Sequence, residues 1–229
     1  MKKFTAGLGT GALLLGTFLP ITHVIAQEGS EGLEEIIVTS ERREASLQDV
    51  PIAVSAFNEV MLEKFQIDET IELVNVVPNL FGGNNTGLGT ANMYYLRAQG
   101  NDESVATFDP PVGTYVDDVY ITRQNANNFA FFDVERIEVL RGPQGTLFGR
   151  NTTGGAINVI LKKPAEELGG YVEAGAGRFG GTLLRGTVDI PVTSTFLTKF
   201  SAFSMQDDGW LDNVADGNTY NDRENLGLR

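Results

Sequence analysis

One run of 27 residues, from Val134 to Ile160, constrains the fold more than any other part of the chain. It contains two stretches rich in β-branched residues, Ile137–Leu140 and Ala156–Leu161, and these predict two buried strands. The turn between the strands contains six residues that break a strand, permit positive φ or allow close backbone approach: Gly142, Pro143, Gly145, Gly149, Gly154 and Gly155. The run therefore predicts a strand, a glycine-rich turn and a second strand in a short span.

The first 26 residues indicate export from the cytoplasm. Lys2 and Lys3 precede an apolar run from Leu8 to Leu19, and Val24-Ile25-Ala26 has the small-residue form that a signal peptidase cleaves. A transmembrane helix is the alternative, but the run is too short and is interrupted by glycines. We predict that residues 1–26 are a cleaved signal peptide.

The residue inventory excludes most catalytic and metal chemistry. The chain has no cysteine, and its single histidine, His23, lies inside the predicted signal peptide. The mature chain therefore lacks thiols and imidazoles, which removes most zinc, iron and copper sites and all histidine-based catalysis. We predict that the protein is not an enzyme and has no catalytic residue, metal or cofactor. Its net charge of −13 argues against a nucleic-acid partner.

Residues 45–164 combine strands and short helices, which favours a compact α+β domain with a small mixed sheet. A strand is predicted from Val50 to Phe57, and a helix from Glu59 to Phe65 with Asn58 as its cap. The other predicted elements are a helix that starts at Asp68 or Thr70 and ends before Pro78, a loop over Asn79–Asn92, strands over Met93–Arg97 and Val112–Ile121, and a loop over Asn101–Pro111.

Residues 165–229 alternate between apolar and polar residues with the period of a strand. In the stretch Leu183–Ile190, Leu184 and Val188 point one way while Arg185 and Asp189 point the other. Strands of about ten residues with alternating short and long connections favour a transmembrane β-barrel. A small soluble β-domain is the alternative, but four strands cannot close and would leave open edges.

The Val134–Ile160 run resembles the C-terminal half of the plug domain of TonB-dependent outer-membrane receptors, and the resemblance extends over the whole chain. It implies a plug domain over residues 45–164 and the first strands of the barrel over residues 165–229. Barrels of this kind have about 22 strands. We therefore expect the chain to be an N-terminal fragment of a receptor.

The periplasmic segment over residues 27–44 contains an apolar β-branched run in an acidic setting, which predicts an extended conformation. A frayed edge strand is one interpretation. The resemblance implies a TonB box that adds as a strand to the sheet of the TonB protein. Its residues would be Glu35, Ile36, Ile37, Val38 and Thr39.

Charged residues in the predicted plug strands need partners once a barrel encloses them. The candidates are Arg97, Glu138, Arg141 and Arg150. The resemblance implies that Arg97 and Arg141 pair with acids of the barrel wall, which this sequence does not include. The family usually has glycine where this chain has Ala98. Simple surface arginines are the alternative.

The resemblance implies an energised importer in the outer membrane, surrounded by lipid. An external small ligand would bind the barrel loops and the plug loops Phe81–Thr90 and Asn101–Pro110. Ferric siderophores are the first expectation, with haem, cobalamin and oligosaccharides as alternatives. A secreted periplasmic binding or adhesion module that uses the plug fold alone is an alternative of another class, and it would be soluble.

Overall fold

The computed structural model describes residues 36–39, 42–85, 88–105 and 107–229. All of them belong to one compact unit, Glu35–Arg229. The predicted signal peptide and Glu35, the first residue of the predicted TonB box, lie outside the described residues. Within the described part of the chain, no helix is long and apolar enough to cross a membrane.

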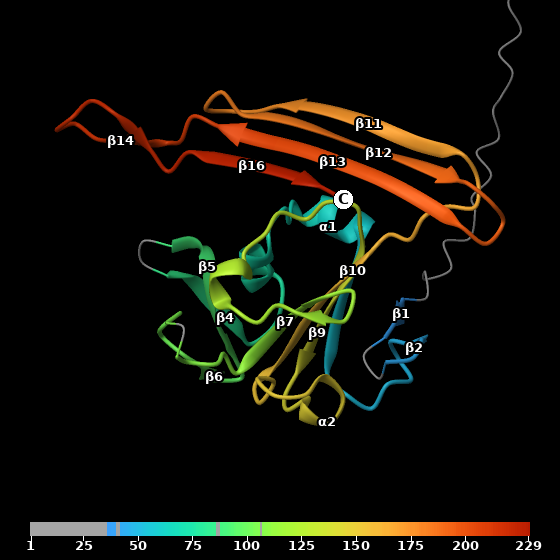
Figure 1. The fold of residues 1–229 in the computed structure, drawn as a ribbon. Coiled ribbons are helices and arrows are strands. Elements are labelled where there is room, and N and C mark those ends of the chain that lie inside the picture. Colours follow the sequence, from blue (N-terminus) through green and yellow to red (C-terminus); the bar gives the residue numbers. More distant parts are fainter. Residues whose placement is uncertain (1–35, 40–41, 86–87, 106) are drawn as a thin grey trace, which may run out of the picture. The chain divides into compact units, whose positions relative to one another are not determined.

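A five-stranded sheet forms the centre of the plug, in the order β3-β9-β10-β7-β8 (Figure 1). The two strands predicted around the glycine-rich turn are β9 and β10, which pair antiparallel with Leu140 opposite Ala156. Strand β10 pairs parallel with β7, and β3 is an edge strand bound to β9. The bounds are β3 Val54–Asn58, β7 Val112–Val116, β8 Val119–Tyr120, β9 Val134–Arg141 and β10 Gly155–Leu161.

The prediction of one continuous strand over Val112–Ile121 is wrong. Asp117 and Asp118 have φ values of 46° and 65° and form the turn of a hairpin between β7 and β8. Two successive residues with positive φ match the right-handed twist of a tight hairpin, and aspartate tolerates this conformation.

One face of the sheet is covered by helices and a hairpin. Helix α1 spans Glu59–Phe65, and the Asn58 side chain caps it by accepting a hydrogen bond of 2.9 Å from the Met61 backbone N–H. The 3-10 helix η1, Thr70–Asn75, follows as predicted for this stretch. Apolar residues from these helices, the hairpin and the sheet form the main core: Phe57, Leu62, Ile67, Leu73, Val77, Leu80, Tyr94, Leu96, Val112, Phe131, Val134, Ile137, Val139, Ile157 and Val159.

The predicted loop over Asn79–Asn92 is instead a hairpin. Strand β4, Leu80–Asn85, pairs with β5, Leu88–Leu96, and β5 then pairs with the short strand β6, Gln99–Gly100. Asparagine is rare in strands, but here the Asn84 amide donates to the Asn92 side chain at 2.9 Å. This hydrogen bond pairs the two amide side chains across the hairpin. The asparagine-rich stretch that we assigned to a loop from its composition therefore forms strands. The remaining short helices are η2, Gln124–Ala126, and α2, Gly145–Phe148.

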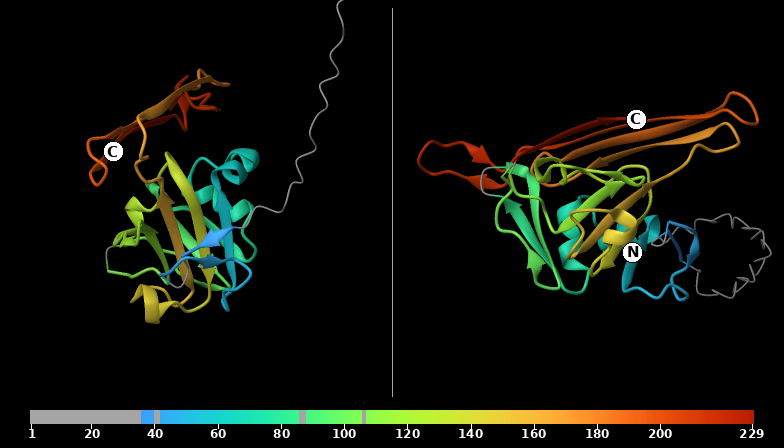
Figure 2. Two further views of the ribbon diagram at one scale, coloured as in Figure 1. Left: turned by 90° about the vertical axis from the view of Figure 1, so that its right-hand side faces the viewer. Right: turned by 60° about the horizontal axis from the view of Figure 1, so that its bottom comes forward.

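The N-terminal segment and the chain after the plug form separate sheets. Strand β1, Ile37–Val38, pairs antiparallel with β2, Ala45–Ser46. Four longer strands form an antiparallel sheet in the order β11-β12-β13-β16 (Figures 1 and 2). Their bounds are β11 Gly169–Ala176, β12 Thr182–Pro191, β13 Leu197–Asp207 and β16 Arg223–Leu228, and a short hairpin of β14 Leu211–Asp212 and β15 Thr219–Tyr220 lies between β13 and β16.

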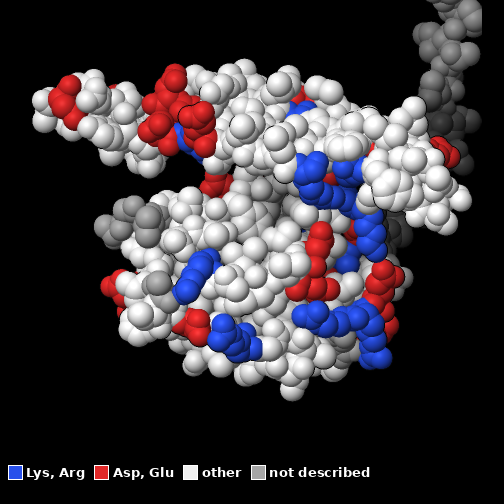
Figure 3. All heavy atoms as spheres, in the orientation of Figure 1, with Lys and Arg blue, Asp and Glu red and all other residues white. Residues whose placement is uncertain are grey.

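Strand register separates the two faces of this four-stranded sheet. One row across it contains Val172, Gly186, Ala202 and Leu228, and the next contains Tyr171, Thr187 and Ser201. The first face is apolar over most of its length. The second bears the charged residues Glu173, Arg185, Asp189, Lys199, Asp207, Arg223 and Arg229. In Figure 3 the visible surface of these strands is mostly uncharged, and acidic side chains gather near β14.

Phe203 breaks the alternation of β13 for a structural reason. It shares a face with Lys199 and lies with its ring centroid 5.0 Å from that of Phe132 in the plug. Its apolar ring therefore contacts the plug. The predicted fold, an α+β plug with a small mixed sheet followed by antiparallel strands, is confirmed.

Candidate functional site

The segment predicted to be a TonB box is bound to the plug rather than free. Ile37 is opposite Ser46 and Val38 is opposite Ala45, and the Leu47 N–H donates to the Ile36 carbonyl at 2.9 Å. The Val38 side chain is fully buried, whereas Ile37 is 40% exposed. One side of this short strand is thus covered while the other faces solvent.

Glu138 in β9 holds the end of this segment. Its Oε1 atom accepts hydrogen bonds from the Thr39 backbone N–H at 2.7 Å and the Thr39 hydroxyl at 3.1 Å. The same oxygen accepts from Arg136 Nε at 2.9 Å, and the Glu138 side chain is completely buried. Hydrogen bonds to an ionised carboxylate are stronger than neutral ones, so Glu138 is the main polar attachment of the segment.

A cleft of about 340 Å³ adjoins this attachment, and its lining includes Thr39, Arg136, Asn158 and Lys162. Asn158 lies opposite Glu138 in the sheet register and is 1% exposed. Within the described part of the chain, neither amide atom of Asn158 nor Oε2 of Glu138 has a hydrogen-bond partner. An unpaired buried polar atom costs about 1–3 kcal/mol, so these atoms reduce the stability of the plug at this point.

The glycines of the β9–β10 connection allow close approach. Gly155 has a φ of 153°, and a β-carbon there would collide with the Leu140 carbonyl oxygen. Gly149 ends α2 with a φ of 84°, and Gly154 lies against Gln99. Pro143 is exposed at the turn, whereas Gly142 is buried.

The structure places the Arg97 guanidinium beside Gly142, the residue after Arg141, and neither arginine forms an ion pair with an acid among the described residues. A β-carbon added at Gly142, next to Arg141, would lie 3.3 Å from the Arg97 guanidinium. Arg97 and Arg150 are exposed, and Nε of Arg141 is buried without a partner in the part of the chain described. Arg97 and Ala98 have φ values of 51° and 64° and form the turn between β5 and β6. A glycine would adopt this conformation with less strain.

Sequence reasoning missed Asp133, which joins the plug to the four-stranded sheet. Its carboxylate accepts hydrogen bonds of 2.9 Å from both Lys199 and Ser201. No motif marks these residues, because the pairing joins positions more than 60 residues apart. Asn158 was missed because only the sheet register places it opposite Glu138. Arg136 was missed although it lies two residues before Glu138 on the same strand, a spacing that puts both side chains on one face.

The buried tyrosines of the plug serve as neutral hydrogen-bonding groups. Burial raises the pKa of Tyr94, whose hydroxyl accepts a hydrogen bond of 2.7 Å from the Asn92 amide. Burial also raises the pKa of Tyr115, whose hydroxyl donates to the Phe148 carbonyl at 2.8 Å. The described residues contain no group of three or more His, Cys, Asp or Glu side chains able to hold a metal ion.

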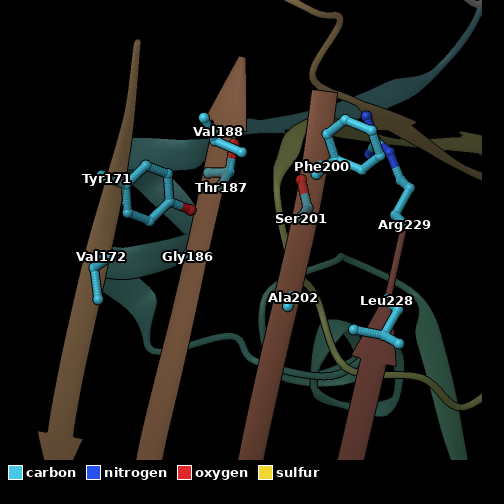
Figure 4. A pocket seen from close by; sticks show the side chains of 10 residues that line it. All are labelled: Tyr171, Val172, Gly186, Thr187, Val188, Phe200, Ser201, Ala202, Leu228 and Arg229. Carbon is cyan, nitrogen blue, oxygen red and sulfur yellow. The ribbon is translucent and has the colours of Figure 1, made fainter. Parts of the chain in front are cut away.

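A groove of about 670 Å³ lies on the four-stranded sheet. Figure 4 shows its side chains distributed over neighbouring strands, with Val172, Val188 and Leu228 among them. Its lining is largely apolar and includes no cluster of convergent polar groups. Such a surface suits contact with apolar material rather than specific recognition of a polar ligand.

Comparisons with known proteins identify relatives that match most of this chain. A family model described as the TonB-dependent receptor plug domain matches residues 46–156. The pesticin receptor of Yersinia pestis is 29% identical over 209 residues, 90% of this chain and 30% of that protein. The vitamin B12 transporter BtuB of Vibrio vulnificus is 25% identical over 181 residues, 77% of this chain and 28% of that protein.

A solved structure supports the same relationship. The ferric yersiniabactin uptake receptor FyuA from Yersinia pestis matches with a TM-score of 0.63 and 26% identity, covering 73% of this chain and 26% of that one. The chain spans about 30% of the length of the curated relatives it matches. The match includes the plug and extends to the strands that follow it.

Proposed function

Because this chain belongs to the TonB-dependent receptor family, with its plug region and some of the strands that follow, we propose that it acts in energised uptake of a ferric siderophore or similar iron complex across the outer membrane. The family consists of transporters without enzymatic activity. In the proposed arrangement the plug closes the barrel. The TonB protein pulls the N-terminal segment, and this pull opens a path for the ligand through the barrel.

The observation that carries this proposal is the way residues 36–39 are held. Two paired residues and the Thr39–Glu138 hydrogen bonds attach the segment to the plug. These contacts are few enough to be exchanged for main-chain hydrogen bonds with a partner's sheet edge. We infer that Ile36 to Thr39, with Glu35 before them, form the TonB box.

The iron ligand is supported by the relatives whose names state their role. FyuA is a ferric yersiniabactin uptake receptor, and it exceeds 25% identity to this chain. Cobalamin is a second candidate, because the vitamin B12 transporter BtuB is also a relative. The apical loop residues Asp102, Glu103 and Asp109 are exposed and supply no feature that selects between the two.

Uptake by cells tests the proposal. The intact receptor is expressed in a bacterium that lacks its own siderophore and cobalamin receptors, with and without TonB. The probes are ferric yersiniabactin carrying radioactive iron and labelled cyanocobalamin. TonB-dependent accumulation of iron is the expected result. Accumulation of cobalamin alone would favour the second candidate, and equal accumulation without TonB would contradict energised uptake.

A further inference from the structure

The plug and the four-stranded sheet are joined by ion pairs of a single polarity. In three such pairs between described residues, the acid belongs to the plug and the base belongs to a strand of the sheet. Glu63 lies 3.6 Å from Arg185, Glu69 lies 3.5 Å from Arg223, and Asp133 lies 2.9 Å from Lys199. Figure 3 shows basic and acidic side chains together beside the sheet. This shared polarity makes the two surfaces electrostatically complementary, which favours their association.

The Asp133 cluster is the most buried part of this surface. The Asp133 side chain is 0% exposed and that of Lys199 is 6% exposed. Ser201 Oγ donates to the second carboxylate oxygen at 2.9 Å, and the Arg229 guanidinium lies 3.7 Å from the same oxygen. A buried charge that keeps such partners is stable, whereas removing one partner is strongly destabilising.

The backbone at Asp133 is also fixed on both sides. Its carbonyl accepts a 2.9 Å hydrogen bond from the Lys162 N–H, just before the chain leaves the plug. Its φ of 55° is a conformation that non-glycine residues adopt only when their surroundings hold them there. The preceding residue, Phe132, contacts Phe203 of β13. Asp133 and Phe132 thus combine polar, apolar and main-chain contacts at the junction between the plug and β13.

The N-terminal side of the plug is held differently. Strand β3 is an edge strand, so its pairing within the sheet is with β9 on one side only, although Phe57 also packs into the main core. Along the described part of the chain, Glu63 in α1 is the first residue with an ion pair to the four-stranded sheet. A pull on the N-terminal segment thus meets β1 and β3 first and the ion-pair surface only from α1 onward.

We propose that Asp133, with Lys199 and Ser201, anchors the plug to β13, and that this attachment remains while the residues before α1 are drawn away. Asp133 is a positioning residue in this proposal, because it touches no transported ligand. The inference rests on the proposed function only in that the force enters through the N-terminal segment.

Single-molecule pulling on the intact receptor in lipid nanodiscs tests the anchor. These 229 residues contain no cysteine, so Glu34→Cys provides a handle that is unique among them and does not require TonB. Release of residues 34–58 frees about 80 Å of chain at about 3.3–3.6 Å per residue. In the parent receptor, we expect the first unfolding event to release about this length of chain and then to stop. Lys199→Met and Ser201→Ala change β13 and leave the plug sequence unchanged. Each substitution should raise, at least threefold, the fraction of first unfolding events that continue past α1.

Asp189→Asn is the matched control. Asp189 lies 3.8 Å from Lys199 but belongs to the same sheet, so its replacement should leave the release length unchanged. Heat-dependent gel mobility confirms that each variant has a folded barrel. A first event of about 340 Å, corresponding to release through Asp133, would overturn the anchor. Variants that release the same length as the parent would overturn it as well. Neither result depends on whether TonB binds, which is tested separately by Ile37→Pro.

Discussion

At the scale of single residues, Glu138 decides how firmly the N-terminal segment is held. It accepts both hydrogen bonds that Thr39 donates, and no other described side chain accepts from Thr39. Its position in a central strand fixes that acceptor in place. The charge of Glu138 is therefore explained without a partner on the barrel wall.

Glu138→Ala should release the segment. Loss of hydrogen bonds to a charged group costs about 1.5–3 kcal/mol, which corresponds to at least a tenfold shift toward the undocked state. The readout is the rate of maleimide labelling of Val38→Cys, because Val38 is fully buried when docked. Glu135→Ala is the control, since Glu135 also pairs with Arg136 but does not bind Thr39. Equal labelling rates in the two variants would contradict this role for Glu138.

Asn158→Leu should stabilise the plug. The substitution removes two buried polar atoms that lack partners in the described structure and places an apolar side chain beside a cleft with room for it. We expect a gain of about 1 kcal/mol, because an unsatisfied buried group costs at least that much. Hydrogen exchange at the amides of β9 and β10 in the intact receptor should slow about fivefold. Faster exchange would show that the amide makes bonds that its removal breaks.

Residue roles were the hardest features to predict from the sequence. The roles of the glycines from Gly142 to Gly155 could be predicted, because few residues other than glycine fit a backbone with positive φ or a close backbone contact. The roles of Asp133 and Asn158 could not be predicted, because their neighbours come from other segments that only the folded structure brings together. Ion pairs between distant positions leave no local spacing to recognise.

At the scale of elements, strand periodicity was the most reliable signal. The strands β9, β10, β12 and β13 follow the predicted alternation or apolar runs closely. The errors occurred where polar residues adopt strand or turn conformations through tertiary contacts. Asn84 and Asn92 pair across a hairpin that their composition assigned to a loop, and Asp117 and Asp118 form a turn inside an apparently continuous strand.

The two faces of β16 should tolerate charge differently. Asn225 lies on the charged face and its amide is 3.4 Å from Glu69, so Asn225→Lys keeps a polar partner. Leu226 lies on the opposite, apolar face and is 76% exposed. Leu226→Lys should cost about 2–4 kcal/mol if it lies near the middle of the bilayer. The amount of folded receptor in outer membranes measures this difference, and equal amounts would contradict the assignment of faces.

At the scale of the whole molecule, the chain combines a weakly held segment with a firmly attached plug. The segment depends on a two-residue pairing and Glu138, whereas the plug is joined to the sheet by ion pairs that include the buried Asp133–Lys199 contact. This difference allows one part to respond to a pull while another keeps its place. The family and the fold could be predicted from the sequence, but the ligand could not, because its contacts depend on loops whose side chains have no fixed pattern.

The central claim, that Ile36 to Thr39 couple the receptor to TonB, is tested most directly by Ile37→Pro in the intact receptor. Proline removes a backbone N–H and prevents strand addition, while the conservative control Ile37→Val preserves it. Binding of ferric yersiniabactin to cells and its TonB-dependent uptake are measured for both variants. We expect Ile37→Pro to bind the probe as the parent does and to lose at least 90% of its uptake, with Ile37→Val unaffected. Uptake by Ile37→Pro at the parental rate would contradict the claim.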